Sequence, residues 1–293
     1  MPDKLTLPIP TRLTASFVVA APQQLPEDLT RLATVLHSDD APHGVDLVPY
    51  VDVRSVDVPP MPTLAHLFSC PDCDRTDPAL AHRISTSDTY IHVSCCGGAS
   101  WPPSHVPLAA AVAEAQAIHT GGIPIDADNA VMLAAEYMPY PLTEPSDFHV
   151  AGWTIITYTS HSTGLRLQTS GLVRLGLPEL RIDEVPQPLA GAWGRVLDGL
   201  AQSLLSQQWT AVNLGQASWE LDAETTITTA DIEAAVGSRH HHSDASVTVR
   251  LHQDGSDEPV LTVGPPDGAS GAAAQQWHRR IVQRLGLPTD HRT

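Results

Sequence analysis

Lysine is nearly absent from this sequence, and its absence argues against several classes of enzyme. Lys4 is the single lysine, so arginine supplies every other cation among the 16 Lys and Arg residues. A Walker phosphate-binding loop, a Schiff-base enzyme and a nuclease site that combines acids with a lysine all need a lysine inside the fold. We therefore expect none of these chemistries.

Long apolar runs and numerous cysteines are missing as well. No segment approaches the roughly 20 apolar residues of a membrane-spanning helix. The best signal-peptide candidate, Leu13–Ala21, is short, is interrupted by Thr14 and Ser16, and alternates as a strand does. Four cysteines, two of them adjacent, are too few for a disulfide framework in a chain of 293 residues. We predict a cytoplasmic protein that does not bind membranes.

Recognised catalytic motifs are also lacking. The chain has no G-x-S-x-G, no H-E-x-x-H and no dinucleotide-binding glycine motif. The segment 126–129 begins like a calcium loop, but Val131 stands where glycine is needed and Tyr137 where glutamate is needed. We interpret this segment as an exposed acidic turn. The sequence favours a role other than catalysis.

Acidic residues dominate the charge that is present. The chain has 33 Asp and Glu residues and a formal net charge of −17. Such a surface repels the phosphates of nucleic acids and anionic lipids, and it attracts a basic protein. We predict a basic protein partner and no nucleic-acid partner, with solubility alone as the alternative explanation of the charge.

The hydrophobic pattern interleaves strands and helices irregularly, which is typical of the α+β class. Strands are predicted at 13–19, 45–58, 90–96, 148–158, 165–169, 247–251 and 260–263. Helices are predicted at 26–36, 77–84, 103–119, 188–207 and 277–285. The clearest amphipathic stripe consists of Leu189, Trp193, Val196, Leu200 and Leu204.

We predict a mixed sheet with helices packed on it, in a single large α+β domain over residues 13–287. Its core is expected at 13–208, followed by a more polar part at 209–287, with tails at 1–12 and 288–293.

The segment Gly171–Leu180 has the pattern Gly-Leu-x-x-Leu-Gly-Leu-Pro-Glu-Leu. It follows a hairpin predicted from the strands 148–158 and 165–169, and it precedes the helix predicted at 188–207. It resembles an uncharacterised bacterial family of unknown function, and Tyr90–Ser94 resembles that family's central strand. The resemblance covers about residues 13–208. Where the family often has a Trp-Gly pair, this chain has Ile123–Asp126. Some members lie near toxin and immunity genes, which implies an immunity-like role. The family has no established catalytic residues to carry over to this chain.

Cys70 and Cys73 form a Cys-x-x-Cys pair whose spacing lets two thiolates bind one zinc ion, and Pro71 favours the tight turn between them. His66 precedes the pair by four residues, and His82 follows it by nine. These four side chains would close a short loop at a small entropic cost. We predict zinc as the cofactor, held by His66, Cys70, Cys73 and His82.

Alternatives to this zinc set remain open. In one alternative Cys70 and Cys73 are a redox pair, and in another they are unpaired thiols. The proline-bounded loop favours metal binding over redox chemistry. His92 and Cys96 share one face of the next strand and form a competing pair, whereas Cys95 points toward the core. The tract 240–242 is three histidines that could bind a transition metal weakly, but loop-like neighbours favour a solvated loop.

Cys96 precedes Gly97-Gly98 and could be a nucleophile whose neighbouring amides bind an anion. A phosphatase-like site would also need an arginine a few residues on, and 99–104 contains none. A buried structural cysteine is the favoured interpretation.

The function that these observations favour is binding of another protein, as an immunity-like or regulatory partner of a basic protein. An alternative is a metal- or thiol-dependent enzyme centred on residues 66–96. A third possibility is a structural subunit of a larger assembly.

Overall fold

The computed structural model describes residues 3–22, 48–55, 78–87, 89–100, 102–129, 131–132, 148–238, 244–253 and 259–289. Strands and helices interleave within these ranges and one sheet is mixed, which confirms the α+β class. The chain divides into two compact units, which we call unit 1 (Met1–Pro10 and Ser146–Thr293) and unit 2 (Thr11–Pro145). This boundary does not coincide with the polar transition near residue 208. The single-domain prediction stays a prediction.

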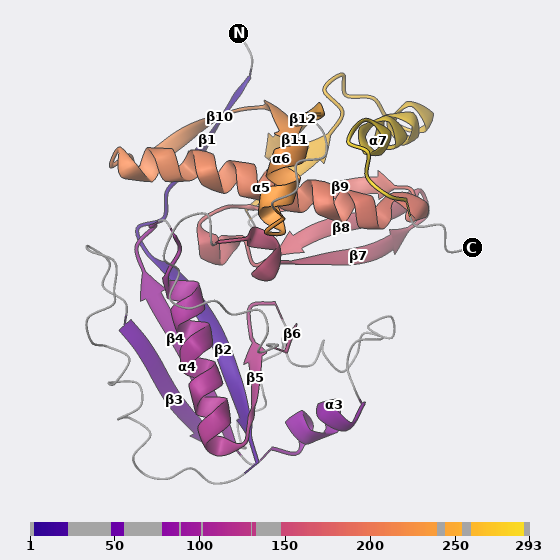
Figure 1. The fold of residues 1–293 in the computed structure, drawn as a ribbon. Coiled ribbons are helices and arrows are strands. Elements are labelled where there is room, and N and C mark those ends of the chain that lie inside the picture. The colour runs from indigo at the N-terminus through magenta and orange to yellow at the C-terminus, as the bar shows by residue number, and fades with distance from the viewer. Residues whose placement is uncertain are drawn as a thin grey trace. The chain divides into compact units, whose positions relative to one another are not determined.

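Unit 2 contains a five-stranded sheet of order β3-β4-β2-β5-β6 with antiparallel neighbours (Figure 1). The strands are β2 (Leu13–Ala21), β3 (Val48–Ser55), β4 (Thr89–Gly97), β5 (Ile123–Asp126) and β6 (Val131–Met132). Strands β4 and β5 flank β2 and are therefore parallel to each other. Helix α4 (His105–Thr120) connects them and packs on the sheet, while α3 (Pro78–Ser85) precedes β4. The helix predicted at 77–84 and the strand predicted at 90–96 are confirmed as α3 and β4.

Alternation along β4 explains which face α4 covers. Ile91, Val93 and Cys95 are fully buried, whereas the residues between them are partly exposed. Helix α4 is rich in alanine, whose short side chain permits close packing on the sheet. Gly121 ends the helix in the left-handed conformation at φ 66°, as the sequence predicts. The alternating burial along β4 and the small side chains of α4 together allow the helix to pack closely on one face of the sheet.

Unit 1 contains a six-stranded mixed sheet of order β11-β12-β13-β9-β8-β7 (Figure 1). Its strands are β7 (Ile155–His161), β8 (Gly164–Ser170), β9 (Glu179–Val185), β11 (Glu224–Thr228), β12 (Ser246–Gln253) and β13 (Val260–Gly264). Strands β9 and β13 are parallel and the other neighbours are antiparallel. A separate two-stranded ribbon pairs β1 (Lys4–Pro8) with β10 (Ser218–Asp222).

Helix α5 (Ala190–Asn213) packs on the apolar face of this sheet, and α6 (Thr229–Ala235) packs against α5. The predicted stripe is confirmed: all five of its side chains are buried, and Trp193 is fully buried. At Gly199 a Cβ atom would lie 2.5 Å from Cγ1 of Ile232, so only glycine permits this approach of α6. The close packing of α6 against α5 thus depends on glycine at position 199.

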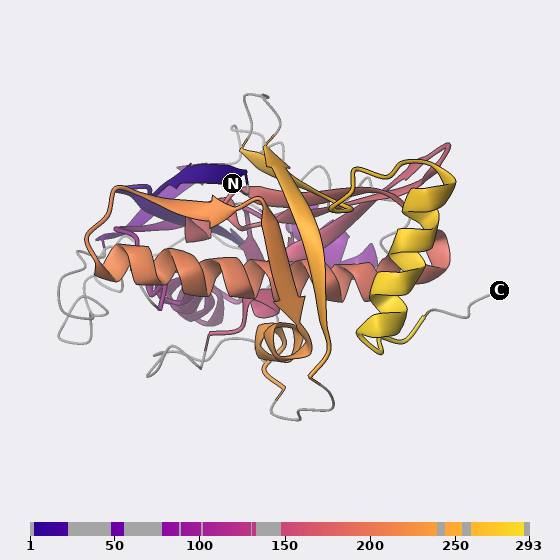
Figure 2. The same cartoon turned by 90° about the horizontal axis from the view of Figure 1, so that it is seen from above.

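Helix α7 (Ala272–Arg284) lies beside the N-terminal half of α5 (Figure 2). The rings of Trp193 and Trp277 are 5.1 Å apart, and the ring of His278 meets Trp193 edge-on at the same distance. His278 is only 2% exposed. Aromatic pairs at such distances contribute beyond their buried area, so this cluster anchors α7 to the core.

Three predictions differ from the structure. Residues 4–8, assigned to a tail, form β1, because their partner β10 lies more than 200 residues away and no local pattern announces it. The strand predicted from residue 148 begins at Ile155, after a short 3-10 turn. The turn at 126–129 is buried: Asp126 is 3% exposed and accepts hydrogen bonds from the amides of Asp128 and Asn129. The helix predicted at 26–36 lies outside the described residues.

Candidate functional site

The predicted zinc ligands are only partly placed by the structure. His66, Cys70 and Cys73 lie outside the described residues, as does the histidine tract 240–242. His82 is exposed on α3, where its backbone carbonyl accepts hydrogen bonds from the hydroxyls of Ser85 and Thr86. Among the residues that the structure describes, no group of three or more His, Cys, Asp or Glu side chains could hold a metal ion. The zinc set stays a prediction, and elemental analysis of protein never exposed to a chelator tests it.

His92 and Cys96, the competing pair, lie on the same partly exposed face of β4. Four residues of extended chain separate their Cα atoms by about 13 Å. Zinc–ligand bonds of about 2 Å cannot bridge that separation on one rigid strand. The two side chains therefore cannot share an ion as an isolated pair.

The Cys96 thiol is the centre of a small polar cluster in unit 2. Thr14 is its cross-strand partner on β2, and the Thr14 hydroxyl lies 3.3 Å from Sγ of Cys96. Arg12 precedes β2 and donates a hydrogen bond from Nη2 to the same sulfur over 3.2 Å. The structure thus places a guanidinium and a hydroxyl on one half-buried thiol.

These contacts set the acidity of the two adjacent cysteines in opposite directions. Partial burial by itself would raise the pKa of Cys96, but the hydrogen bonds from Thr14 and Arg12 and the guanidinium charge outweigh it and lower the pKa. Burial raises the pKa of Cys95 to about 12. Cys95 is therefore a core thiol, as predicted, whereas Cys96 is stabilised as a thiolate.

The arginine that contacts Cys96 is Arg12, which immediately precedes β2. Residues 99–104, downstream of the cysteine, contain no arginine, whereas Arg12 lies 84 residues upstream. A signal existed in the alternating pattern of 13–19 and 90–96, which permits the two strands to pair. The register that aligns Thr14 with Cys96 is a tertiary property.

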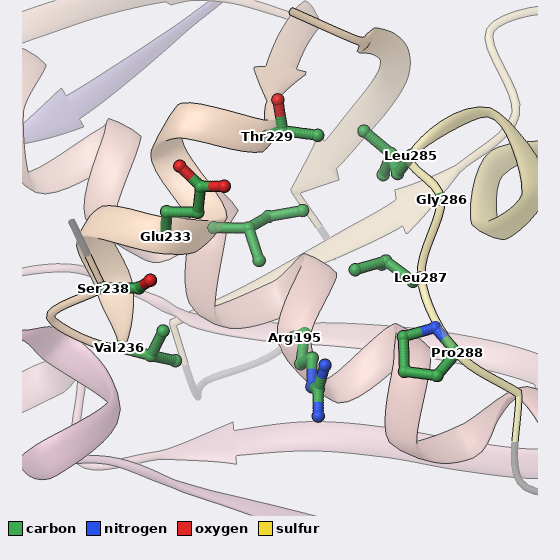
Figure 3. A pocket seen from close by; sticks show the side chains of 10 residues that line it. Arg195, Thr229, Glu233, Val236, Ser238, Leu285, Gly286, Leu287 and Pro288 are labelled. Carbon is green, nitrogen blue, oxygen red and sulfur yellow. The ribbon is translucent and has the colours of Figure 1, made fainter. Parts of the chain in front are cut away.

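A pocket of about 500 Å³ lies in unit 1 between α5, α6 and the segment that follows α7 (Figure 3). Gly286 forms it by adopting φ 65° after the helix end, which redirects Leu287 and Pro288 along the wall. The lining is mostly apolar, with Ile232 and Leu285 buried. Its polar members are Arg195, Thr229, Glu233 and Ser238. The sequence indicated no such pocket, because its walls come from three separate segments.

The ribbon of β1 and β10 and the residues next to it carry an exposed group of carboxylates, which we call the acidic ribbon: Asp3 just before β1, Glu220 and Asp222 on β10, and Glu224 at the start of β11. The alternate side chains of the ribbon, including Leu7, Trp219 and Leu221, are buried. Two cations face the acidic ribbon. Lys4 pairs with Glu220 at 2.6 Å, and Arg250 pairs with Asp3 and Glu224.

No protein-family model, curated protein or solved structure matches this chain. The family resemblance of the segment 171–180 therefore stays a prediction. Within the part of the chain that the structure describes, no helix is long and apolar enough to cross a membrane.

Proposed function

We propose that this chain is a binding protein for a basic protein, with an immunity-like or regulatory role. The observation that carries the proposal is the acidic ribbon, where four exposed carboxylates face two cations. Among the residues that the structure describes, Asp222 forms no direct ion pair and interacts only electrostatically with Lys4, its cross-strand neighbour, so its carboxylate is accessible to a partner. Complementary charge mainly accelerates association and sets orientation, which suits recognition of a strongly basic surface.

The net charge of −17 supports the same proposal at long range. Surface charges act over about 10 Å at 0.1 M salt, so association would slow steeply as salt rises. If the acidic residues served solubility alone, removing any one exposed carboxylate would have the same small effect on binding. A localised site predicts that the acidic ribbon matters more than other acids of the same exposure.

The test begins with affinity capture and continues with the purified captured protein. Asp222→Asn should weaken its binding severalfold, and Asp244→Asn, an equal charge change at an exposed residue outside the ribbon, should not. Binding should also weaken from low salt to above physiological salt. Equal effects of the two variants, a captured protein that is acidic, or indifference to salt would overturn the proposal.

A second candidate function, thiol chemistry, is favoured by the cluster of Arg12, Thr14 and Cys96. A lowered thiol pKa increases the nucleophilic thiolate at neutral pH. Iodoacetamide should alkylate Cys96 faster than an ordinary exposed thiol, and Arg12→Gln should slow the reaction and raise its midpoint pH. Alkylation of Cys96 at the same rate in both proteins would remove this candidate.

A further inference from the structure

The pocket between α6 and the segment after α7 has the dimensions and lining of a small-molecule site. Its volume of about 500 Å³ lies within the range of ligand pockets, roughly 300–1,000 Å³. Val236 lies on one side of the pocket, and Leu285, Leu287 and Pro288 form the other (Figure 3). Ile232 of α6 also lines it. Such a lining selects a ligand with an apolar body.

Arg195 supplies the polar group that orients a ligand. It projects from α5 at an exposed position of the pocket, and its guanidinium makes no hydrogen bond or ion pair among the described residues. Arg166 and Arg250, by contrast, each pair with carboxylates of this acidic chain. An arginine fork without a partner at an apolar pocket fits a planar carboxylate.

The other charges limit the ligand to a single negative charge. Glu233 contributes a carboxylate from α6, on a different wall from Arg195 (Figure 3). The chain as a whole carries −17. A second anionic group at the far end of the ligand, or a doubly charged phosphate, would meet this negative potential.

We propose that this pocket binds an amphipathic monocarboxylic acid. The carboxylate binds the guanidinium of Arg195, and the aliphatic chain lies between α6 and the segment Leu285–Pro288. This site is separate from the acidic ribbon and does not depend on the protein-binding role.

The experiment titrates the full chain with decanoate and follows heat and NMR chemical shifts. Decanoate should bind with one-to-one saturation and shift the resonances of Ile232 and Leu287. Decanol, which lacks the charge, and decanedioate, which adds one, should each bind at least tenfold more weakly. Arg195→Gln should weaken decanoate at least tenfold and Arg195→Lys less, while Arg279→Gln, an exposed arginine of α7 outside the pocket, should change nothing.

Because Arg195 is exposed, its variants should keep the melting temperature of the parent, which separates lost binding from lost folding. Decanol binding as tightly as decanoate, decanoate affinity unchanged in Arg195→Gln, or shifts without saturation would each overturn the proposal. Absence of any decanoate binding to the parent chain would overturn it too.

Discussion

Helix α5 in unit 1 and helix α4 in unit 2 each cover one face of a sheet, but they bury different side chains. Trp193, Leu197 and Leu200 of α5 are fully buried, whereas α4 buries Ala109 and Ala113 completely. A layer of large side chains loses most when one is truncated, and a layer of small side chains loses most when one is enlarged. Truncating a side chain in α5 and enlarging one in α4 therefore test the packing of the two helices in opposite ways.

The largest effect is expected in α5. Trp193→Ala should lower the free energy of unfolding by about 3–5 kcal/mol, because it empties a fully buried site that also contacts Trp277 and His278. Urea denaturation of the full chain measures it. Leu214→Ala, at a residue that is 69% exposed just beyond the helix, is the control and should cost almost nothing. An unchanged stability of the tryptophan variant would contradict the packing of α5.

The second effect is a pH dependence in the same layer. Burial lowers the pKa of His278 from 6.5 to about 4, against an opposing hydrogen bond with the backbone of Asp183. Between pH 6.5 and 4 the unfolded state therefore binds more protons than the native state, and stability falls as the pH falls. The loss should approach about 3 kcal/mol across that interval. His278→Gln should remove this dependence of stability on pH. If the dependence persists unchanged in the variant, His278 is not its cause.

The third effect has the opposite sign. Burial raises the pKa of Asp198 on α5 from 3.8 to about 7. The native state then binds more protons between these values, so Asp198 makes stability fall as the pH rises through the interval. Asp198→Asn should raise stability at pH 8 by about 2 kcal/mol, less than the full shift implies because the side chain is partly exposed. At pH 4 the stabilities of the parent and the variant should differ little. Equal stabilities at pH 8 would contradict the raised pKa of Asp198.

An effect of similar size or smaller is expected in α4. Ala113→Leu should cost about 1–3 kcal/mol, because the added atoms must enter a fully packed layer against the sheet. Ala115→Leu, at a partly exposed position of the same helix, controls for helix propensity and should cost less than half as much. If the enlarged residue at 113 is tolerated without loss, the alanine layer is not closely packed. The contrast between α4 and α5 would then fail.

Local patterns predicted much of the fold. The stripe from Leu189 to Leu204 predicted α5, and Gly121 correctly marked the end of α4. Both signals lie within one element, where 3.6-residue periodicity and left-handed glycine act over a few residues. The ribbon of β1 and β10 was missed because five-residue strands carry too little pattern without their partner. The short, capped α6 was missed for the same reason.

The candidate sites were less predictable than the fold. The sequence raised Cys96 as a candidate nucleophile but favoured a buried structural cysteine, whereas the structure leaves it partly exposed and in contact with Arg12 through the register of β2 and β4. The pocket at Arg195 combines a helix surface, a second helix and a chain reversal at Gly286. Sequence spacing reports only neighbours along the chain, and these contacts join residues that are neighbours only in space.

The sequence by itself determined the α+β class, the acidic charge and the amphipathic faces, because composition and periodicity are local properties. Tertiary structure decided which arginine has a partner. Arg12 meets a thiol and Arg250 meets carboxylates, while Arg195 is left at the wall of an apolar pocket. The physical reason is that a cation's partner depends on which strands pair and in which register, and that register is set by burying the apolar face of the sheet.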